Sequence, residues 1–563
     1  MTFSRDHWRD VAIVAVWFFV LIFAGYGLRD PWPADEPRFA LIARDMLTHG
    51  NWLFPQVGGD LYQDKPPLHF WMIALCLQLT GSLRTAFLLP SMLASLGTLL
   101  LVQDLARRLH GREAGTLAAI TLVSSVLFLV TTRGAQIDAT LIFFCTLAAY
   151  GFLRHLLLGP DWRWVAIGAA AAGLGVLDKA VGFLAFFIWP LAWWLRRRGS
   201  ESIRAGVLGR RAVWLIPLVF STVLAAWLVP MLVTVATSGS AALEAYRDEL
   251  LFQQTVQRYA AAWHHVKPWY YYLVEVIPAL WLPTTALLPW LWSRWRDDWR
   301  RIDARVWLPL AWVICIVLFF SVSPGKRGVY VLPALPAFVW AAAPHLAHLY
   351  AQRGVQRISL ALGALLVVLG AAFAIAASLH VPAARTVLED IELESLLPLW
   401  TFVVVATVTW LIAARWRAIA AWPAVLACLA MCWGWGIAPQ IDSERSASGF
   451  VRTMSSKVDR SRDLGLLAYK EQFLLYLDRP VTNFGHARWR EGMAETYDAA
   501  RWLAGDANRV LLVPGTLLEP CFKEARRIEA GDSSDETWWL VSGVPADDCV
   551  ARGNPAKVIR YSP

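Results

Sequence analysis

Long apolar runs separated by short polar loops recur along the first 438 residues of this 563-residue chain. A helix that crosses a bilayer needs about 20 mostly apolar residues, and most of these runs approach that length. The chain is 57% hydrophobic and only 17% charged, which excludes a soluble globular protein and a disordered one. The sequence therefore predicts a polytopic α-helical membrane protein.

Thirteen spans are predicted, and one shorter apolar run is not counted among them. The run Leu68–Gly81 is too short to cross a bilayer, so we expect it to lie in the interface or to re-enter. The predicted spans cover residues 11–28, 85–105, 114–131, 137–158, 163–177, 180–195, 213–236, 269–292, 305–322, 328–349, 357–379, 396–414 and 418–438.

The basic residues of the loops predict the orientation. Lys and Arg favour cytoplasmic loops, and the arginine-rich loops at 196–198 and 294–301 fall on one side if the N-terminus is cytoplasmic. The long loops 29–67 and 237–268 then lie outside, in the periplasm of a bacterial inner membrane. The net charge is +9, but many of the cations lie in short inner loops, so no nucleic-acid binding is expected.

The polar tail, residues 439–563, is long enough for a small domain. Short apolar runs alternate there with helical patterns, which favours a small soluble α/β domain in the periplasm, beside a transmembrane domain of residues 1–438. Cys521 and Cys549 form a disulfide or remain two free thiols, and the sequence leaves both open. Strands are expected at Leu464–Tyr469, Arg509–Gly515, Thr537–Gly543 and Val558–Tyr561, and helices at Glu471–Leu477 and Met493–Leu503.

Two carboxylates and a cation follow the first span directly, in the segment Asp35-Glu36-Pro37-Arg38. Pro37 suits the first turn of a helix, so Asp35 or Glu36 could simply cap that helix. A carboxylate beside the membrane could instead act as general base on an acceptor hydroxyl. For Asp35 we favour this catalytic interpretation, and Glu36 is kept as a second catalytic candidate.

The end of the first outer loop presents Tyr62, Asp64 and Lys65 just before the stiff pair Pro66-Pro67. Lys65 could hold a phosphate as a point charge. The alternative is that its ammonium only reaches the interface while its stem lies along apolar surface.

Further charged groups lie at other outer junctions of the predicted spans. Asp138 opens the fourth span, where a helix dipole alone would also favour a carboxylate. The tight loop before Tyr330 contains Lys326 and Arg327 beside glycine, which suits an anion. The loop 237–268 contains Arg258, His264 and His265. Either histidine could complete a metal site with Asp64, although an adjacent pair is a weak motif.

These cations and carboxylates together predict a site for a lipid phosphate and a polar acceptor, in which cations stabilise a leaving phosphate. The blocks that contain them resemble the aminoarabinose transferase family of the GT-C glycosyltransferases, which also include the protein mannosyltransferases. The resembling blocks are Asp35-Glu36-Pro37-Arg38-Phe39-Ala40 with residues 42–46, 50–52 and 62–71, then Leu251–Tyr259 with His264, His265 and Pro268, and then Phe319–Pro333.

The resemblance implies an inverting glycosyltransferase that uses a polyprenyl-phosphate sugar as donor and a lipid or protein as acceptor. The sugar would be 4-amino-4-deoxy-L-arabinose or a hexose, and the acceptor lipid A, another glycolipid or a protein. Asp35 would be the catalytic or acceptor-positioning carboxylate, and Asp138 would orient the sugar or the acceptor. Lys65 and Arg258 would bind the carrier phosphate, with Tyr62 and Tyr330 nearby. A divalent metal at Asp64 is also implied, although the family more often has Glu at that position.

A transporter or flippase of lipid-linked sugars is the alternative function. Transporters often contain two related halves with interrupted helices near the bilayer midplane. No repeat is visible in this sequence, and the charged candidates gather at one predicted face. The pattern favours the enzyme.

Overall fold

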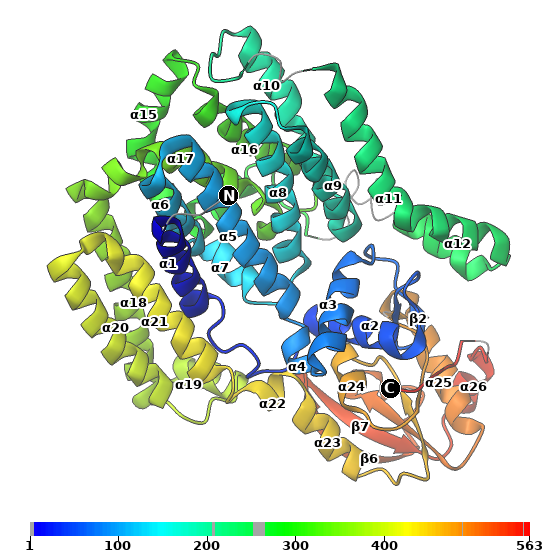
Figure 1. Cartoon of the computed structure of the whole chain (residues 1–563). Coiled ribbons are helices and arrows are strands. Elements are labelled where there is room, and N and C mark those ends of the chain that lie inside the picture. Colours follow the sequence, from blue (N-terminus) through cyan, green and yellow to red (C-terminus); the bar gives the residue numbers. More distant parts are fainter. Residues whose placement is uncertain (1–4, 205–208, 252–264, 487, 556) are drawn as a thin grey trace.

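The computed structural model describes residues 5–563 except 205–208, 252–264, 487 and 556, and most of its elements are helices (Figure 1). The main helices of the first 438 residues are α1 (Arg5–Leu21), α5 (Leu89–His110), α6 (Arg112–Val123), α7 (Val126–Thr132), α8 (Ile137–Leu158), α9 (Trp162–Lys179), α10 (Ile188–Arg197), α11 (Arg210–Ser238), α15 (Leu288–Arg300), α16 (Ala304–Val322), α17 (Ala334–Ala351), α18 (Arg353–Ser378), α20 (Leu397–Trp416) and α21 (Ala421–Met431).

Seven helical segments in the described part of the chain are long and apolar enough to cross a membrane. They are Leu83–His110, Ile137–Leu158, Arg210–Ser238, Ala304–Val322, Arg353–Ser378, Leu397–Trp416 and Ala418–Ile437. Two bent pairs, α6 with α7 at 66° and residues 272–280 with 285–300 at 98°, raise the number to nine if each is one span. The chain is therefore a multi-pass membrane protein, and the count of thirteen spans stays a prediction.

The surface of the helical part is suited to lipid contact. Only 11% of the apolar window of α11, and 17% of those of α18 and α20, is buried inside the protein. Apolar faces of this size on a water-soluble protein would promote association. Their exposure is the arrangement expected when lipid tails, which are themselves apolar, cover them.

The first helix ends earlier than its apolar run. The run continues to residue 28, but α1 ends at Leu21 and Gly25 adopts a φ of +83°. A Cβ at Gly25 would lie 2.3 Å from the carbonyl oxygen of Gly434, so the two backbones approach in a way that only glycine allows. The chain then turns into the first outer loop, where the candidate residues lie.

Short helices and one hairpin connect the longer helices of this part. The run Leu68–Gly81 forms a short helix, α3 (Leu68–Thr80), in agreement with its length. Helix α2 (Glu36–His49) and the hairpin β1 (Gln56–Val57) and β2 (Asp60–Leu61) precede it. The remaining short helices in this part are α4 (Leu83–Ala86), η1 (Gly182–Phe187), α12 (Ala241–Asp248), η3 (Tyr272–Val276), α14 (Ile277–Leu280), η4 (Thr285–Leu287), η5 (Gly328–Val331), α19 (Pro382–Asp390), η6 (Ala418–Ala420) and η7 (Cys432–Ile437).

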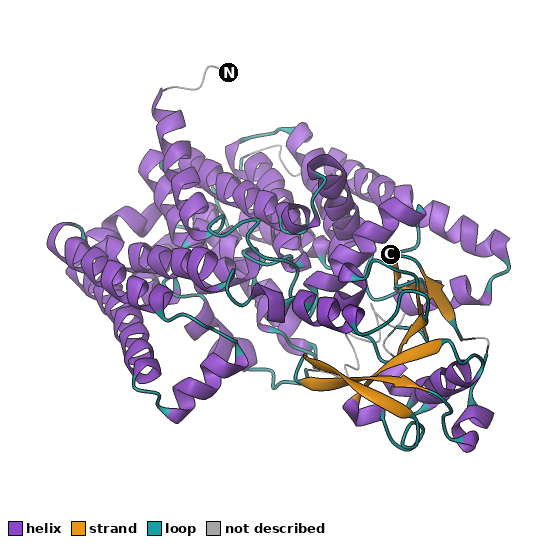
Figure 2. Ribbon diagram, turned by 90° about the horizontal axis from the view of Figure 1, so that it is seen from below, coloured by secondary structure: helices purple, strands orange, loops and turns teal. Residues whose placement is uncertain are grey.

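The tail contains one six-stranded sheet in the order β6-β7-β5-β3-β4-β8. The central strand β3 pairs in parallel with β4 and β5, and the other pairs are antiparallel. Figure 2 shows the strands gathered at one side of the helices. The elements are α22 (Asp442–Arg445), α23 (Ser448–Ser456), β3 (Asp463–Leu466), α24 (Glu471–Tyr476), β4 (Val481–Asn483), η8 (Arg488–Glu491), α25 (Ala494–Ala504), β5 (Arg509–Pro514), η9 (Gly515–Leu517), β6 (Arg526–Ser533), β7 (Glu536–Ser542), α26 (Asp547–Arg552) and β8 (Ile559–Tyr561).

Strands β3, β5, β7 and β8 lie where apolar runs predicted strands, whereas β4 and β6 were not predicted. Strand β4 has only three residues, and most residues of β6 are exposed, so neither produces an apolar run. Cys521 and Cys549 form a disulfide, which resolves the alternative that the sequence left open.

The sheet region packs on the first outer loop rather than standing apart from it (Figure 1). Arg44 of α2 donates to the carbonyl oxygen of Leu474 at 2.8 Å, and Asn483 donates to that of Gly58 at 2.9 Å. The hydroxyl of Tyr561 donates to Asp45 Oδ1 at 2.6 Å. The last of these bonds attaches the last strand of the chain, β8, to α2, the helix that starts beside Asp35.

Candidate functional site

Asp35 precedes helix α2, but its side chain does not cap that helix. The carboxylate instead faces Arg38, with Oδ1 3.6 Å from Nη1, and a quarter of the side chain is exposed. Pro37 lies in the first turn, where its missing N–H costs no hydrogen bond. The capping interpretation of Asp35 is therefore not supported, and its carboxylate remains accessible to a substrate.

Arg38 connects Asp35 to the sheet region. Its Nε donates to Glu471 Oε1 at 2.7 Å, and His486 Nε2 lies 2.9 Å from the same oxygen. The guanidinium also lies 6.0 Å from the ring centroid of the buried Tyr62. Sequence reasoning missed Glu471 and His486, because nothing local distinguishes them and only the packing of the tail brings them here.

The pKa of Glu471 reflects these contacts. Burial raises it, but the hydrogen bonds and charges of His486 and Arg38 outweigh burial and lower the pKa from 4.5 to about 2. A carboxylate whose pKa is lowered in the folded state stabilises that state above its unfolded pKa, and this contribution is lost as the pH falls toward the folded value.

Replacing Glu471 by Gln should therefore reduce stability at neutral pH by up to about 3 kcal/mol, and by much less near pH 2. Thermal unfolding of the two proteins across pH 2–7 measures this, with the exposed Glu519→Gln as control. If the unfolding midpoints of the wild type and of Glu471→Gln changed with pH in the same way, the pair of Glu471 with Arg38 would contribute nothing to stability.

Glu36 is buried and fully engaged by the protein. Arg29 binds both of its oxygens, at 2.5 Å through Nη1 and 2.7 Å through Nη2. The backbone N–H groups of Trp32 and Ala135 each donate to one oxygen at 2.9 Å. Because Ala135 lies three residues before Asp138, Glu36 joins the start of α2 to the start of α8.

Asp138 lies in the first turn of α8 and forms an ion pair with Lys179 at the end of α9, at 2.6 Å. The Lys179 ammonium lies 4.9 Å from the ring centroid of Tyr330 in η5. Three elements thus bring a carboxylate, a cation and a tyrosine together. The sequence analysis placed Asp138 and Tyr330 in the site but did not single out Lys179, although an ionisable residue between apolar runs is itself a functional signal.

Lys326 is buried in its own loop. Its ammonium donates to the carbonyl oxygens of Lys267 at 3.0 Å and Ser323 at 2.5 Å, and its backbone N–H donates to that of His265 at 2.9 Å. These bonds hold the loop 265–267 against the loop 324–326. The phosphate-binding role of Lys326 and of the exposed Arg327 stays a prediction.

Arg258 and His264 lie outside the described residues. Lys65 and Asp64 follow the β1–β2 hairpin, and both make further contacts with the protein. Within the described ranges, no group of three His, Cys, Asp or Glu side chains is arranged to hold a metal ion. The described residues thus do not by themselves form the predicted metal site.

Comparisons with known proteins identify chains that are similar in sequence and in fold. The family described as dolichyl-phosphate-mannose-protein mannosyltransferase matches residues 64–228. An undecaprenyl phosphate-alpha-4-amino-4-deoxy-L-arabinose arabinosyl transferase of Pseudomonas aeruginosa (strain UCBPP-PA14) is 31% identical over 348 residues, which cover 59% of this chain and 58% of that protein. The relative of the same name from Shewanella sediminis is 28% identical over 345 residues, 58% of each chain. The matched region thus spans less than two thirds of these relatives.

The fold extends the likeness over nearly the whole chain. The crystal structure of ArnT from Cupriavidus metallidurans bound to undecaprenyl phosphate superposes with a TM-score of 0.72 at 17% identity, covering 98% of this chain and 100% of that one. The apo structure of the same protein also has a TM-score of 0.72. Together these matches show that the chain has the fold of ArnT and is similar in sequence to aminoarabinose transferases over 59% of its length.

Proposed function

We propose that this protein is a glycosyltransferase of the bacterial inner membrane that moves a sugar from a polyprenyl-phosphate carrier to an acceptor at the periplasmic face. The observation that carries the proposal is the meeting of two helix starts through Glu36, whose Oε1 accepts the N–H of Ala135 at 2.9 Å. It supports a site in which Asp35 and Asp138 act on one substrate.

In the proposed reaction the acceptor oxygen attacks the anomeric carbon of the sugar. The bond between that carbon and the carrier phosphate breaks, and its electron pair leaves with the phosphate. Asp35 accepts the proton when the acceptor is a hydroxyl. When the acceptor is an ionised phosphate there is no such proton, and Asp35 positions the acceptor. Asp138, held by Lys179 at 2.6 Å, orients the sugar or the acceptor.

The names of the relatives suggest the donor: 4-amino-4-deoxy-L-arabinose on undecaprenyl phosphate. A hexose donor is the other candidate, and lipid A, another glycolipid or a protein is the acceptor. The deciding experiment incubates the purified protein with radiolabelled polyprenyl-phosphate sugars and each acceptor, then determines the product mass. Translocation of the carrier across vesicles without any transferred sugar would identify a flippase and overturn the proposal.

The proposal includes thirteen spans, with the N-terminus in the cytoplasm and the tail in the periplasm. The disulfide between Cys521 and Cys549 supports this orientation, since disulfides persist in the oxidising periplasm and are rare in the cytosol. Reporter fusions at Arg204 and Arg300 should be cytoplasmic, whereas fusions at Ala245 and Gly485 should be periplasmic. A cytoplasmic fusion at Gly485 would overturn both the span count and the location of the site.

Replacing Lys65 by Ala should weaken carrier binding and lower transfer by more than tenfold. A charge-assisted contact to phosphate contributes roughly 1.5–3 kcal/mol, and tenfold corresponds to about 1.4 kcal/mol. Binding of undecaprenyl phosphate and transfer are measured side by side, with the exposed Lys523→Ala as control. Near-normal binding in Lys65→Ala would leave this side chain with only the interfacial role.

A further inference from the structure

A pocket lies at the other end of the helices from the candidate site. Helix α17 starts just after Tyr330, which belongs to the candidate site, and Tyr350 at its end lines this pocket. The helix has 18 residues, which at 1.5 Å per residue separates the two places by about 27 Å. This is close to the thickness of a bilayer core, about 30 Å. The pocket therefore faces the leaflet opposite the candidate site.

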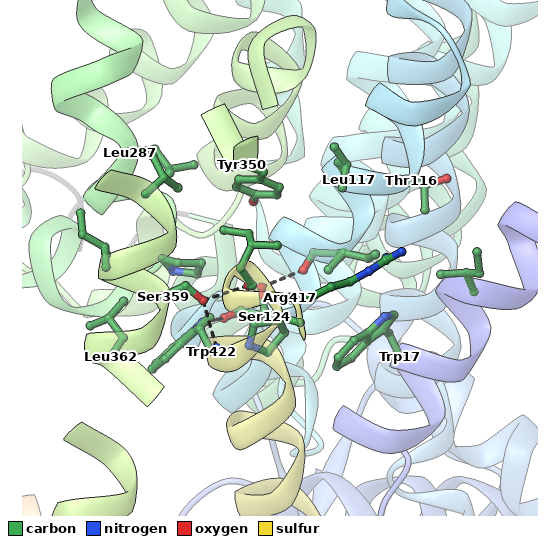
Figure 3. Close-up of a pocket in the computed structure, with 18 residues that line it drawn as sticks. Trp17, Thr116, Leu117, Ser124, Leu287, Tyr350, Ser359, Leu362, Arg417 and Trp422 are labelled. Atoms are coloured by element: carbon green, nitrogen blue, oxygen red, sulfur yellow. Dashed lines mark hydrogen bonds between the residues drawn. The ribbon is translucent and has the colours of Figure 1, made fainter. Parts of the chain in front are cut away.

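The pocket has a volume of about 370 Å³ and lies between two parts of the helical region (Figure 3). Residues of α1, α6 and the end of α17 form one wall, and residues of α18, η6 and α21 form the other. Pockets that hold small molecules usually measure about 300–1,000 Å³ and are mostly apolar. This one is large enough to take part of a lipid.

The polar groups of the wall are already bonded to the protein. The hydroxyl of Tyr350 pairs with Thr121 Oγ1 at 2.5 Å, and Ser359 Oγ donates to the carbonyl oxygen of Ile419 at 2.8 Å. The hydroxyl of Ser124 donates to the carbonyl oxygen of Ile120, also at 2.8 Å. A ligand therefore meets a wall with few free polar groups, which suits a hydrocarbon chain.

Arg417 is the only charged residue that lines the pocket within the described part of the chain. It follows the last residue of α20, and Figure 3 shows its side chain running toward Thr116 and Trp17. Among the described residues, its guanidinium has no hydrogen bond or ion pair, and the residue is exposed. Because Arg417 lies in the loop after α20 and is exposed, its guanidinium is accessible to the phosphate of a lipid head group.

We propose that this pocket binds an acyl chain of an anionic glycerophospholipid of that leaflet, with the lipid phosphate on Arg417. Basic pockets between transmembrane helices on the cytoplasmic side bind anionic lipid head groups. The guanidinium fork matches the phosphate oxygens, and the apolar wall covers the chain. The bound lipid would join the α18–α20 pair, which is mostly lipid-facing, to the helices that position the candidate site. The proposal does not depend on the proposed sugar transfer.

The test compares dioleoylphosphatidylglycerol with dioleoylglycerol, which has the same chains but no phosphate. The full-length protein is purified in detergent, and each lipid is titrated while binding is measured by native mass spectrometry and by thermal stabilisation. We expect the phosphatidylglycerol to bind the wild type at least about tenfold more tightly than the glycerol lipid, as for one charge-assisted contact. Arg417→Ala should lose that preference.

Two further variants make the test specific. Arg415→Ala removes an exposed cation two residues away that does not line the pocket, and it should bind as the wild type does. Thr116→Trp keeps Arg417 but fills part of the pocket, which Thr116 lines, and it should block both lipids. Equal binding of the two lipids by the wild type would overturn the proposal. This comparison uses only the wild-type protein, so it does not depend on whether a variant folds.

Equal loss in Arg415→Ala and Arg417→Ala would also overturn it, since it would indicate general attraction of anionic lipid to a basic surface. Tighter binding of undecaprenyl phosphate than of phosphatidylglycerol, also lost in Arg417→Ala, would assign the pocket to the carrier instead. Sugar transfer measured in the same samples separates the two proposals, because lipid binding at Arg417 can fail while transfer persists.

Discussion

Replacing Asp35 by Asn is expected to lower sugar transfer by about 10²–10⁴-fold, the range for loss of an acid–base group. The change keeps the size of the side chain and removes only its charge. The folded structure should tolerate it, because Asp35 does not cap α2 and its ion pair with Arg38, at 3.6 Å, is partly exposed. Partly exposed ion pairs contribute about 0–1 kcal/mol to the free energy of unfolding. A catalytic role of Asp35 would therefore lower activity without lowering stability, which distinguishes it from a structural role.

The measurement is kcat and KM for a hydroxyl acceptor and for a phosphate acceptor, together with the thermal unfolding midpoint. If Asp35 is a base, kcat falls with the hydroxyl acceptor. If it only positions the acceptor, KM changes as well and both acceptors are affected. The exposed Asp248→Asn should behave as the wild type does. Full activity in Asp35→Asn would remove Asp35 from the catalytic site and leave Glu36 as the remaining catalytic candidate of this segment.

Replacing Glu36 by Gln should have the opposite effect to Asp35→Asn, because stability rather than activity should show the larger loss. Both oxygens of Glu36 accept two hydrogen bonds each, from Arg29, Trp32 and Ala135. The amide nitrogen of Gln cannot accept any of them, and Arg29 would be left as a buried charge without its partner. Breaking one side of a buried ion pair typically costs about 3–5 kcal/mol.

Thermal unfolding and expression of Glu36→Gln test this expectation, and a double variant provides the control. Arg29→Met with Glu36→Leu removes both charges, so it should recover part of the stability that Glu36→Gln loses. Transfer by whatever protein remains folded should fall less than in Asp35→Asn. A Glu36→Gln protein that is as stable as the wild type but inactive would return Glu36 to the catalytic role suggested by the sequence.

Helix positions in this protein were largely predictable, because a bilayer requires long apolar runs and such runs are visible in one dimension. The departures have local causes. Helix α1 is shorter than its run because Gly25 meets Gly434, which is distant in the sequence. Strand β6 was not predicted because most of its residues are exposed and polar, so it carries no apolar pattern.

For the candidate site too, some features could be predicted from the sequence and others depended on the tertiary structure. Asp35, Lys65, Asp138 and Tyr330 were proposed as site residues from the sequence alone, because charged or aromatic side chains at the ends of apolar runs are conspicuous. The sequence by itself thus determined that this is a multi-pass membrane protein, and it proposed which segments carry its chemistry. The tertiary structure decided which side chains bind one another. Glu36 is saturated by Arg29 and two backbone N–H groups, and Glu471 reaches Arg38 across more than 400 positions of chain. Hydrogen bonds and ion pairs depend on distances of about 3 Å in space, which a linear pattern does not contain.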